Sequence, residues 1–374
     1  MNRLEHALST VVLRLLGWLF DRLPIRQRAV LATARVTRLE GNLAYLHDAM
    51  RRARPDLPIV TILEPYSYGL RGKIAYLLRL VRGMYHLRTS SLFVVDNAYL
   101  PVHVAPHRAG TTVVQVWHAV GALKRFGADV SGGLRGPERH FLHRHYDYVV
   151  CAGERSREPW SRAFLTPPDR VLPLGVARTD FFFDPGALAA ARERILGAYP
   201  ALRDGRVVVY APTFRGRGRG KQPAPGFDAA TLRAALPPDH RLVLKSHPNL
   251  DARLVRTDGF DAVIEPSVEM NEVFAAADVL VTDYSSSIFE WALLRRPLVL
   301  LTSDLAEYER EPGLYLDPRT ELIGDRVDDP ADLPRAIAAA RVDEAAWAAF
   351  VARQIEACDG AASDRFVARF LPAG

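Results

Sequence analysis

The stretch Val279-Leu-Val-Thr-Asp-Tyr-Ser-Ser-Ser-Ile-Phe-Glu290 joins three apolar residues to a polar turn and then to a helix-like segment. An uninterrupted apolar run is typical of a parallel strand that is covered on both faces. Residues 207–210, 242–244 and 298–301 are apolar runs of the same kind. The pattern therefore predicts a parallel sheet flanked by helices.

Around this stretch, short apolar runs alternate with helical periodicity from about residue 58 onward. Strands are expected at 58–63, 92–95, 112–117, 147–151, 206–211, 241–246, 278–282 and 297–301. Helices are expected at 69–83, 154–165, 186–198, 269–276, 285–294, 331–340 and 343–357. Residues 167–186 contain four prolines and the triplet Phe181–Phe183, which is typical of an interdomain connection. Two α/β halves follow from this pattern, with ligands expected beyond the carboxyl ends of the strands.

Length and composition exclude several classes of protein. The 374 residues suggest two domains. Hydrophobic residues make up 49% and charged residues 25%, which excludes a mainly disordered chain and a polytopic membrane protein. The two cysteines, Cys151 and Cys358, cannot form a disulfide scaffold, so a reducing compartment is expected.

The basic charge is concentrated near the N-terminus. The net charge of the chain is +6, yet residues 1–90 carry 15 Arg and Lys against 6 Asp and Glu, so the remainder is slightly acidic. Residues 4–23 place leucines and valines at helical spacing, but the apolar run 11–20 contains Arg14 and is too short to span a bilayer.

Two interpretations of this N-terminal helix stay open. It can pack on its own domain, or it can lie in the plane of a membrane with Trp18 and Phe20 at the headgroup level. In the second case, Arg22, Arg26 and Arg28 would meet anionic lipid. A further cationic stretch, Arg71-Gly-Lys73 through Arg79, Arg82 and Arg88, favours the membrane or a polyanionic substrate.

The segment Trp117-His-Ala-Val-Gly-Ala-Leu-Lys-Arg-Phe-Gly127 follows an expected strand and carries a candidate base. A histidine at a strand end can accept a proton from a hydroxyl near neutral pH. We therefore assign His118 as a candidate catalytic base, with Lys124 as a possible substrate contact. The alternative is a hydrogen-bonded histidine at a strand end without catalytic function.

Two further strands end in cationic or hydroxyl residues. In Tyr210-Ala-Pro-Thr-Phe-Arg215, Thr213 and Arg215 suit phosphate oxygens. In Leu244-Lys-Ser-His-Pro248, a protonated His247 beside Lys245 can stabilise a transferring phosphoryl group. An ordinary loop exit and a buried histidine are the alternatives.

The opening stretch places three serines where a helix begins. Backbone N–H groups and the helix dipole make such a helix start an anion site. Ser287 and Glu290 fit a capping box, which leaves Ser285 and Ser286 for a phosphate and Asp283 as a possible substrate contact. The chain has no Asp-X-Asp motif and no set of His and Cys with metal-ligand spacing, so no dedicated metal or cofactor is expected.

Four motifs in order resemble the CDP-glycerol glycerophosphotransferases of teichoic-acid synthesis, over about residues 95–310. They are W-H-x-x-G-x-x-K-x-x-G at 117–127, Y-A-P-T-F-R at 210–215, K-x-H-P at 245–248 and T-D-Y-S-S at 282–286. Many family members have Gly where this chain has Ala119, a change that adds only a methyl group.

The resemblance implies a GT-B fold, an α/β class with two Rossmann-like doubly wound domains facing a cleft. Residues 1–35 are then an amphipathic membrane-association helix region and 36–180 an N-terminal acceptor-side domain. Residues 181–345 are a C-terminal nucleotide-donor domain, and 346–374 carry a last helix that crosses back to the N-terminal domain.

The same resemblance implies transfer of glycerol phosphate from CDP-glycerol to a hydroxyl on an undecaprenyl-diphosphate-linked saccharide, with release of CMP. His118 is then the proposed base and His247 the second essential histidine, while Thr213, Arg215, Ser285 and Ser286 touch the donor phosphates. The enzyme is expected at the cytoplasmic face of the membrane, as a peripheral protein without nucleic acid. The length of the chain favours a primase or another single-addition enzyme.

Three alternatives remain at this point. CDP-ribitol can replace CDP-glycerol as the donor. A GT-B glycosyltransferase or epimerase would use a UDP-sugar. A nucleic-acid-binding or membrane-binding protein without catalysis would use the basic N-terminus and the Arg/Gly loop at 215–221, but it would leave both strand-end histidines unexplained.

Overall fold

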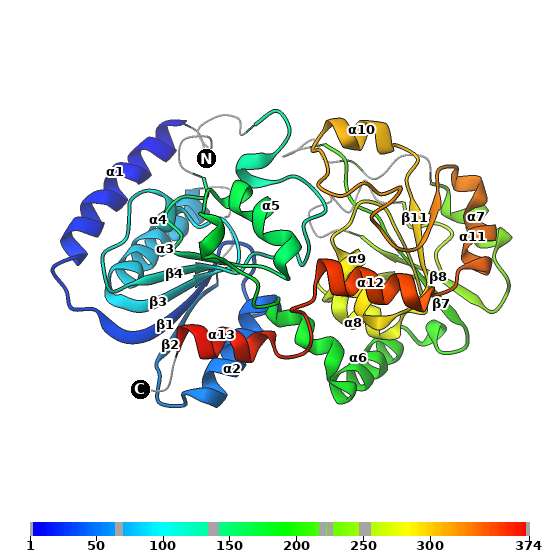
Figure 1. Ribbon diagram of the computed structural model, residues 1–374, viewed down its shortest axis with the longest axis horizontal. Helices are drawn as coiled ribbons and strands as arrows, with labels where there is room; N and C mark the ends of the chain where they lie inside the picture. The colour runs from blue at the N-terminus through cyan, green and yellow to red at the C-terminus, as the bar shows by residue number, and fades with distance from the viewer. Residues whose placement is uncertain are drawn as a thin grey trace. The chain divides into compact units, whose positions relative to one another are not determined.

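The computed structural model divides the chain into two compact units, each of which is described by itself (Figure 1). The structure describes residues 3–63, 70–133, 142–216, 222, 227–246 and 256–371. The first unit takes the chain up to Gly121, then Arg125–Asp180, and finally the residues from Ile355 onward. The second unit consists of Ala122–Lys124 and Phe181–Gln354. The main boundary, at residues 180 and 181, therefore lies inside the proline-rich connection expected from the sequence.

The first unit is built on a sheet of six parallel strands in the order β2-β1-β3-β4-β5-β6. The strands are β1 (Arg26–Thr33), β2 (Ile59–Leu63), β3 (Ser90–Val95), β4 (Thr112–Gln115), β5 (Tyr148–Val150) and β6 (Val171–Leu172). Successive side chains of a strand point to opposite faces, and the interior strands of this sheet are buried on both. This explains why they appear in the sequence as continuous apolar runs.

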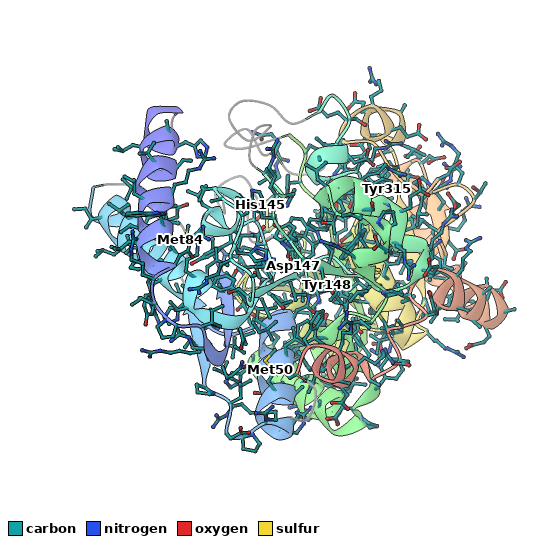
Figure 2. All side chains as sticks on the ribbon, turned by 60° about the vertical axis from the view of Figure 1, so that its left-hand side comes forward. Met50, Met84, His145, Asp147, Tyr148 and Tyr315 are labelled. Atoms are coloured by element: carbon teal, nitrogen blue, oxygen red, sulfur yellow. The ribbon has the colours of Figure 1, made fainter. Side chains whose placement is uncertain are left out.

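Helices complete the first unit. They are α1 (Arg3–Phe20), α2 (Gly41–Ala53), α3 (Leu70–Thr89), α4 (Leu100–His103), α5 (Glu154–Phe164) and α13 (Ala362–Phe370). Met50 of α2 and Met84 of α3 are both fully buried (Figure 2). The C-terminal helix α13 packs against α2, and its Phe366 joins the core that contains Leu31 of β1. The end of the chain thus belongs to the unit with which the chain begins.

The second unit repeats the arrangement with strand order β12-β11-β10-β7-β8-β9, again all parallel. Its strands are β7 (Arg206–Ala211), β8 (His240–Lys245), β9 (Ala262–Ile264), β10 (Val279–Thr282), β11 (Leu298–Leu301) and β12 (Asp325–Val327). Its helices are α6 (Pro185–Ala198), α7 (Ala229–Ala235), α8 (Met270–Ala276), α9 (Ser287–Leu294), α10 (Leu305–Arg310), α11 (Leu333–Ala339) and α12 (Glu344–Gln354). Two α/β units with parallel sheets confirm the predicted fold class.

All eight predicted strands are present, but β1, β6, β9 and β12 were not predicted. The most important of these is β1, which pairs with both β2 and β3 inside the sheet. It begins with Arg26-Gln-Arg28, a polar sequence that was assigned to a lipid-facing segment. Arg28 is in fact 8% exposed, and its Nε donates to Ser90 Oγ at 2.8 Å. The prediction that Arg28 meets anionic lipid is therefore wrong, because its guanidinium donates hydrogen bonds inside the protein to the hydroxyls of Ser90 on β3 and Thr89 at the end of α3.

Other arginines of the basic N-terminal quarter are also buried. Arg79 and Arg88 are 4% and 5% exposed, and Arg88 forms an ion pair with Asp21 at 3.5 Å. These two side chains do not provide the cationic surface expected from the sequence, because they are internal. The side chains of Arg71 and Lys73 lie outside the described residues, whereas Arg82 is exposed.

Helix α1 packs on α3 through one face and leaves the other uncovered within the first unit. Leu13 is fully buried, whereas Leu8, Leu15 and Trp18 are each more than 60% exposed. Nearby Ile74 and Leu78 of α3 are also exposed. None of the described helices is long and apolar enough to cross a membrane.

Two buried histidines make the stability of the first unit dependent on pH. Burial lowers the pKa of His103 to about 4 and that of His143 to about 3, whereas both titrate near 6.5 in an unfolded chain. Between pH 6.5 and 4 the unfolded state therefore binds more protons than the folded state, and stability falls as the pH falls. We expect a loss of about 2 kcal/mol per histidine between pH 6.5 and 5.

Urea unfolding followed by tryptophan fluorescence at pH 7, 6 and 5 measures this dependence. The His143→Asn variant keeps a polar group near Tyr146 but cannot titrate, so its midpoint should fall less steeply between pH 7 and 5 than that of the wild type. Parallel pH profiles for the two proteins would contradict the assignment.

Candidate active site

His118 lies on a short turn that follows the carboxyl end of β4. Its side chain is half-buried, and its ring lies 4.1 Å from the indole of Trp117 between centroids. The Trp117 indole stacks on Phe126 at 5.2 Å with an interplanar angle of 16°. Ligands of open α/β folds bind beyond the carboxyl ends of the parallel strands, and His118 lies at such an end.

The chain then passes from the first unit into the second for three residues. Lys124 pairs with Leu314 in an antiparallel bridge, and the backbone N–H of Tyr315 donates to the carbonyl of Leu123 at 2.8 Å. The ammonium of Lys124 lies 5.1 Å from the ring centre of Tyr308 on α10. The motif that contains His118 thus places its lysine in the second unit.

Arg215 forms the centre of a polar cluster at the carboxyl ends of β7, β10 and β11. Its Nη1 lies 2.9 Å from Asp283 Oδ2, and its Nη2 donates to Asp304 Oδ1 at 3.0 Å. Thr213 completes the cluster, because its N–H and its Oγ1 both donate to Asp283 at 3.0 Å. The order of the strands explains why these residues lie together, since β10 lies between β7 and β11 in the sheet.

The charges of this cluster hold one another in their ionised forms. Burial works against the charge of Arg215, but the hydrogen bond to Asp304 and the charges of Asp283 and Asp304 raise the pKa of Arg215. Burial likewise works against ionisation of Asp304, yet the bond from Arg215 lowers the pKa of this carboxyl. Arg215 therefore remains a cation whose three nitrogen atoms all donate to protein oxygens.

Two stacked tyrosines line the cationic groups. The rings of Tyr284 and Tyr308 lie 4.1 Å apart at 27°, and the guanidinium carbon of Arg215 lies 4.8 Å from the Tyr308 ring centre. Lys124 and Arg215 therefore both lie near Tyr308. This arrangement places cationic and hydroxyl groups suited to phosphate oxygens in one part of the second unit.

The serine turn differs from the capping box expected from the sequence. Helix α9 begins at Ser287, so this residue is the first of the helix and Ser286 is the residue before it. The Oγ of Ser285 accepts hydrogen bonds from the backbone N–H of Ser287 at 3.2 Å and from its hydroxyl at 2.7 Å. The prediction of Ser287 as the cap is therefore wrong, because Ser285 provides the capping oxygen.

Lys245 ends β8 in a buried position. Its ammonium donates to the backbone carbonyl of Glu265 at 2.7 Å, and burial lowers its pKa to about 8. His247, predicted as the second catalytic histidine, lies outside the described residues.

The structure thus brings Thr213, Arg215, Asp283 and Lys124 together in the second unit, while His118 belongs to the first. Sequence reasoning missed Asp304, Tyr284 and Tyr308. A signal for Asp304 existed, because it follows the apolar run 298–301 just as Thr213 follows 207–210. Among the described residues, no group of three or more His, Cys, Asp or Glu side chains is arranged to hold a metal ion.

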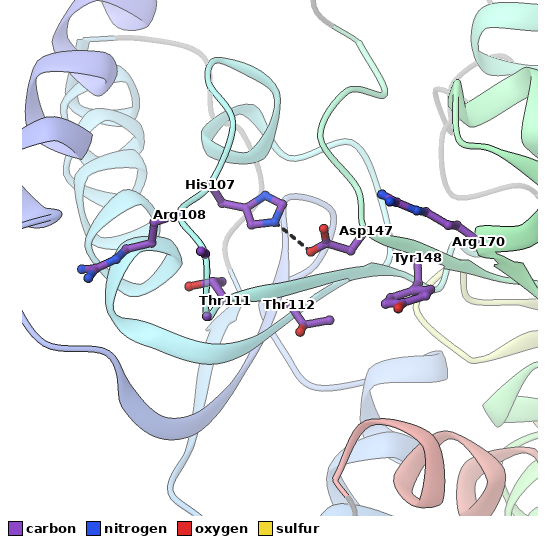
Figure 3. A pocket seen from close by; sticks show the side chains of 9 residues that line it. His107, Arg108, Thr111, Thr112, Asp147, Tyr148 and Arg170 are labelled. Atoms are coloured by element: carbon purple, nitrogen blue, oxygen red, sulfur yellow. Dashed lines mark ion pairs between the residues drawn. The ribbon is translucent and has the colours of Figure 1, made fainter.

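A separate pocket of about 360 Å³ opens at the amino ends of β4 and β5 in the first sheet (Figure 3). It is lined by Thr112 and Tyr148, the first residues of β4 and β5, and by His107, which forms a 2.7 Å ion pair with Asp147. His118 follows the opposite end of β4. None of the predicted site residues in the described part of the chain lines this pocket, so we do not assign it to the candidate active site.

Removal of one carboxylate from Arg215 tests the cluster. In Asp304→Asn the guanidinium loses a charge-assisted pair in a buried setting, which should cost roughly 2 kcal/mol of unfolding free energy. Urea unfolding measures this loss. The matched control is Glu309→Gln on α10, since Glu309 pairs with Arg319 at an exposed position, where solvent screens the ion pair and its loss should cost much less. Equal losses in the two variants would argue against a stabilising role for Asp304.

A solved structure has a similar fold over nearly the whole chain. A crystal structure of the wall teichoic acid polymerase TagF, in a histidine variant soaked with CDPG, superposes with a TM-score of 0.73. It is 20% identical and the match covers 98% of this chain and 95% of that one. The fold is therefore of the GT-B type expected for this family.

Comparison with known sequences identifies relatives. The teichoic acid ribitol-phosphate primase of Bacillus spizizenii is 32% identical over 365 residues, which cover 94% of both chains. The poly(ribitol-phosphate) polymerase of the same organism is also 32% identical, but the match spans only 52% of its length. The model of the CDP-glycerol:poly(glycerophosphate) glycerophosphotransferase family matches residues 19–371. The chain belongs to this family of teichoic acid primases and polymerases.

Proposed function

We propose that this enzyme transfers a polyol-phosphate unit from a CDP-activated polyol to a hydroxyl of a lipid-linked acceptor and releases CMP. One observation carries the proposal. The motif that presents His118 also delivers Lys124 into the second unit, beside Tyr308 and near Arg215. A base and a group of phosphate-binding candidates are therefore joined by a few residues of chain.

In this proposal the two halves of the chain have different substrates. The donor is held by the C-terminal half, where Thr213, Ser285 and Ser286 follow the carboxyl ends of β7 and β10. The acceptor approaches the N-terminal half, which carries His118.

The reaction is an in-line displacement at phosphorus. His118 takes the proton of the acceptor hydroxyl, whose oxygen attacks the β-phosphorus of the donor, and the bond to the CMP oxygen breaks. Lys124 and the α9 start stabilise the negative charge that develops, together with His247 as the sequence predicts. Arg215 touches the donor phosphates through an edge of its guanidinium, or it orders Thr213 and Asp283 for that contact.

The donor alcohol has two candidates. The family description favours glycerol. Ribitol is the second candidate, because the relative that matches 94% of both chains is a ribitol-phosphate primase. The UDP-sugar alternative is not favoured by family membership.

CMP release tests the proposal. The wild type should release CMP from CDP-glycerol or CDP-ribitol only in the presence of a lipid-linked saccharide acceptor, with the length of the product read by mass spectrometry. His118→Ala should lower this turnover by at least about 100-fold, since general base catalysis contributes 10²–10⁴-fold.

The matched control is His107→Ala. It removes a half-buried histidine of the first unit that lies near the amino end of β4, and it should retain most of the activity. Thermal stabilisation by UDP but not by CDP or CMP, or equal turnover of wild type and His118→Ala, would contradict the proposal.

We also propose that α1 binds the cytoplasmic face of the membrane, as a peripheral contact that brings the enzyme to its acceptor. The support is the exposed apolar face formed by Leu8, Leu15 and Trp18, next to an exposed Arg22 whose guanidinium lies 3.5 Å from the Trp18 ring centre. Apolar side chains flanked by arginine are typical of helices that lie in an anionic interface.

Vesicle co-sedimentation tests this contact. The double variant Leu15→Gln, Trp18→Gln should lower binding to phosphatidylglycerol-containing vesicles by at least tenfold, because each buried apolar side chain contributes roughly 1–2 kcal/mol. The control Leu165→Gln changes an exposed leucine of the first unit outside α1 and should bind as the wild type does. Unchanged binding of the double variant would exclude α1 as the contact.

A further inference from the structure

The residue before His118 has a backbone conformation that needs support. Trp117 has a φ of +48°, in the left-handed region. For a bulky residue this region costs about 1–2 kcal/mol relative to ordinary backbone. Other groups must therefore stabilise the turn, and they also determine where the next side chain, His118, points.

The first of these groups is the fully buried amide of Gln115, the last residue of β4. Its Oε1 accepts the backbone N–H of Trp117 at 2.8 Å. Its Nε2 donates to the carbonyl of Asn97 at 3.1 Å and to the hydroxyl of Tyr146 at 2.9 Å. The orientation of the amide is fixed, because only its oxygen can accept from Trp117.

The second group is Asn42, in the first turn of α2 and 3% exposed. Its Nδ2 donates to the carbonyl of Trp117 at 2.8 Å and to that of Val116 at 3.3 Å. Its Oδ1 accepts the backbone N–H of Arg178 at 3.0 Å. The N–H and the carbonyl of Trp117 are thus both held by buried side-chain amides from two different elements.

Aromatic side chains pack around this turn. The Trp117 indole packs edge-on against Phe164 at 5.2 Å and stacks on Phe126. Burial raises the pKa of Tyr146, so its hydroxyl stays neutral as the partner of Gln115. A displaced turn would leave the amides buried without partners, at a cost of about 1–3 kcal/mol for each group.

We propose that Gln115 and Asn42 are positioning residues that fix the left-handed turn at Trp117 and thereby aim His118 at the acceptor hydroxyl. The inference rests on the proposed role of His118 as the base. It assigns a function to two buried amides that do not themselves contact the reacting atoms. Their effect is on the turnover of bound substrate, because a reacting group displaced by about 1 Å can lower the rate about 100-fold.

Two variants test one amide each. Gln115→Met loses the acceptor for the Trp117 N–H together with the donor to Asn97 and Tyr146. Asn42→Asp keeps the acceptor for Arg178 but turns a carboxylate oxygen toward the carbonyls of Val116 and Trp117. Each should lower kcat for CMP release by about 10- to 100-fold and change the KM for the CDP-polyol by less than about twofold. The rate is divided by the number of donor-binding sites measured by calorimetry, since a merely structural role would reduce that number and leave the turnover of each site unchanged.

A conservative variant and a matched control complete the test. In Gln115→Glu a protonated carboxyl can accept from Trp117 and donate to Asn97, so it should recover part of the turnover lost in Gln115→Met. Thr111→Val changes a buried residue next to β4 whose Oγ1 has no hydrogen-bond partner among the described residues, and it should behave as the wild type. Wild-type turnover per site in Gln115→Met and Asn42→Asp would overturn the proposal.

A readout without catalysis separates this proposal from the proposed function. The indole N–H resonance of Trp117, assigned with Trp117→Phe in ¹⁵N-labelled protein, should shift in Gln115→Met and Asn42→Asp but not in Thr111→Val. If the wild type releases no CMP while the resonance shifts, the proposed function fails and the control of the turn stands. An unshifted resonance in both variants rejects the positioning role whatever the activity.

Discussion

Burial of two parallel sheets on both faces is the constraint on which the rest of this structure depends. Such strands are mostly apolar along their length, so polar chemistry collects near the ends of the strands. Gln115 ends β4, and Thr213, Asp283 and Asp304 follow β7, β10 and β11. Within the second unit, strand order therefore gathers Thr213, Asp283 and Asp304, although they lie far apart in the sequence.

The same constraint decides how these groups are stabilised. An isolated charge at a buried strand end would be costly, and each one here has a partner of suitable chemistry. Arg215 pairs with the carboxylates of Asp283 and Asp304, and Lys245 donates to a backbone carbonyl. The neutral amides of Gln115 and Asn42 are likewise hydrogen-bonded to the backbone of Trp117. Fully hydrogen-bonded polar networks of this kind hold their side chains in one geometry.

Much of the fold could be predicted because its signal is local. Apolar runs identify eight strands, and the motifs that follow them identify Thr213, Arg215 and Asp283. What failed depends on long-range partners. Strand β1 was missed because it begins with polar residues. The buried Arg28 among them donates a hydrogen bond to a hydroxyl on β3, and no pattern near residue 28 reveals that partner. The position of Asp304 after an apolar run was readable, but its link to Arg215 exists only through the order of β7, β10 and β11.

The site shows the same division. The motif spacing singles out His118 and Lys124 as candidates, but it does not reveal that Lys124 belongs to the second unit. Nor does the sequence reveal that Asn42, on a helix 75 residues before Trp117, holds the turn beside His118.

The path of the chain has a consequence for exchanging parts between relatives. The second unit is not one continuous piece, since residues 122–124 belong to it, and the first unit is completed by residues after 354. A chimera made with a single junction near residue 180 would combine Leu123 and Lys124 of one parent with Leu314 and Tyr315 of the other. Recombination that respects these pieces needs four junctions, so the two units are harder to exchange independently than their two separate sheets suggest.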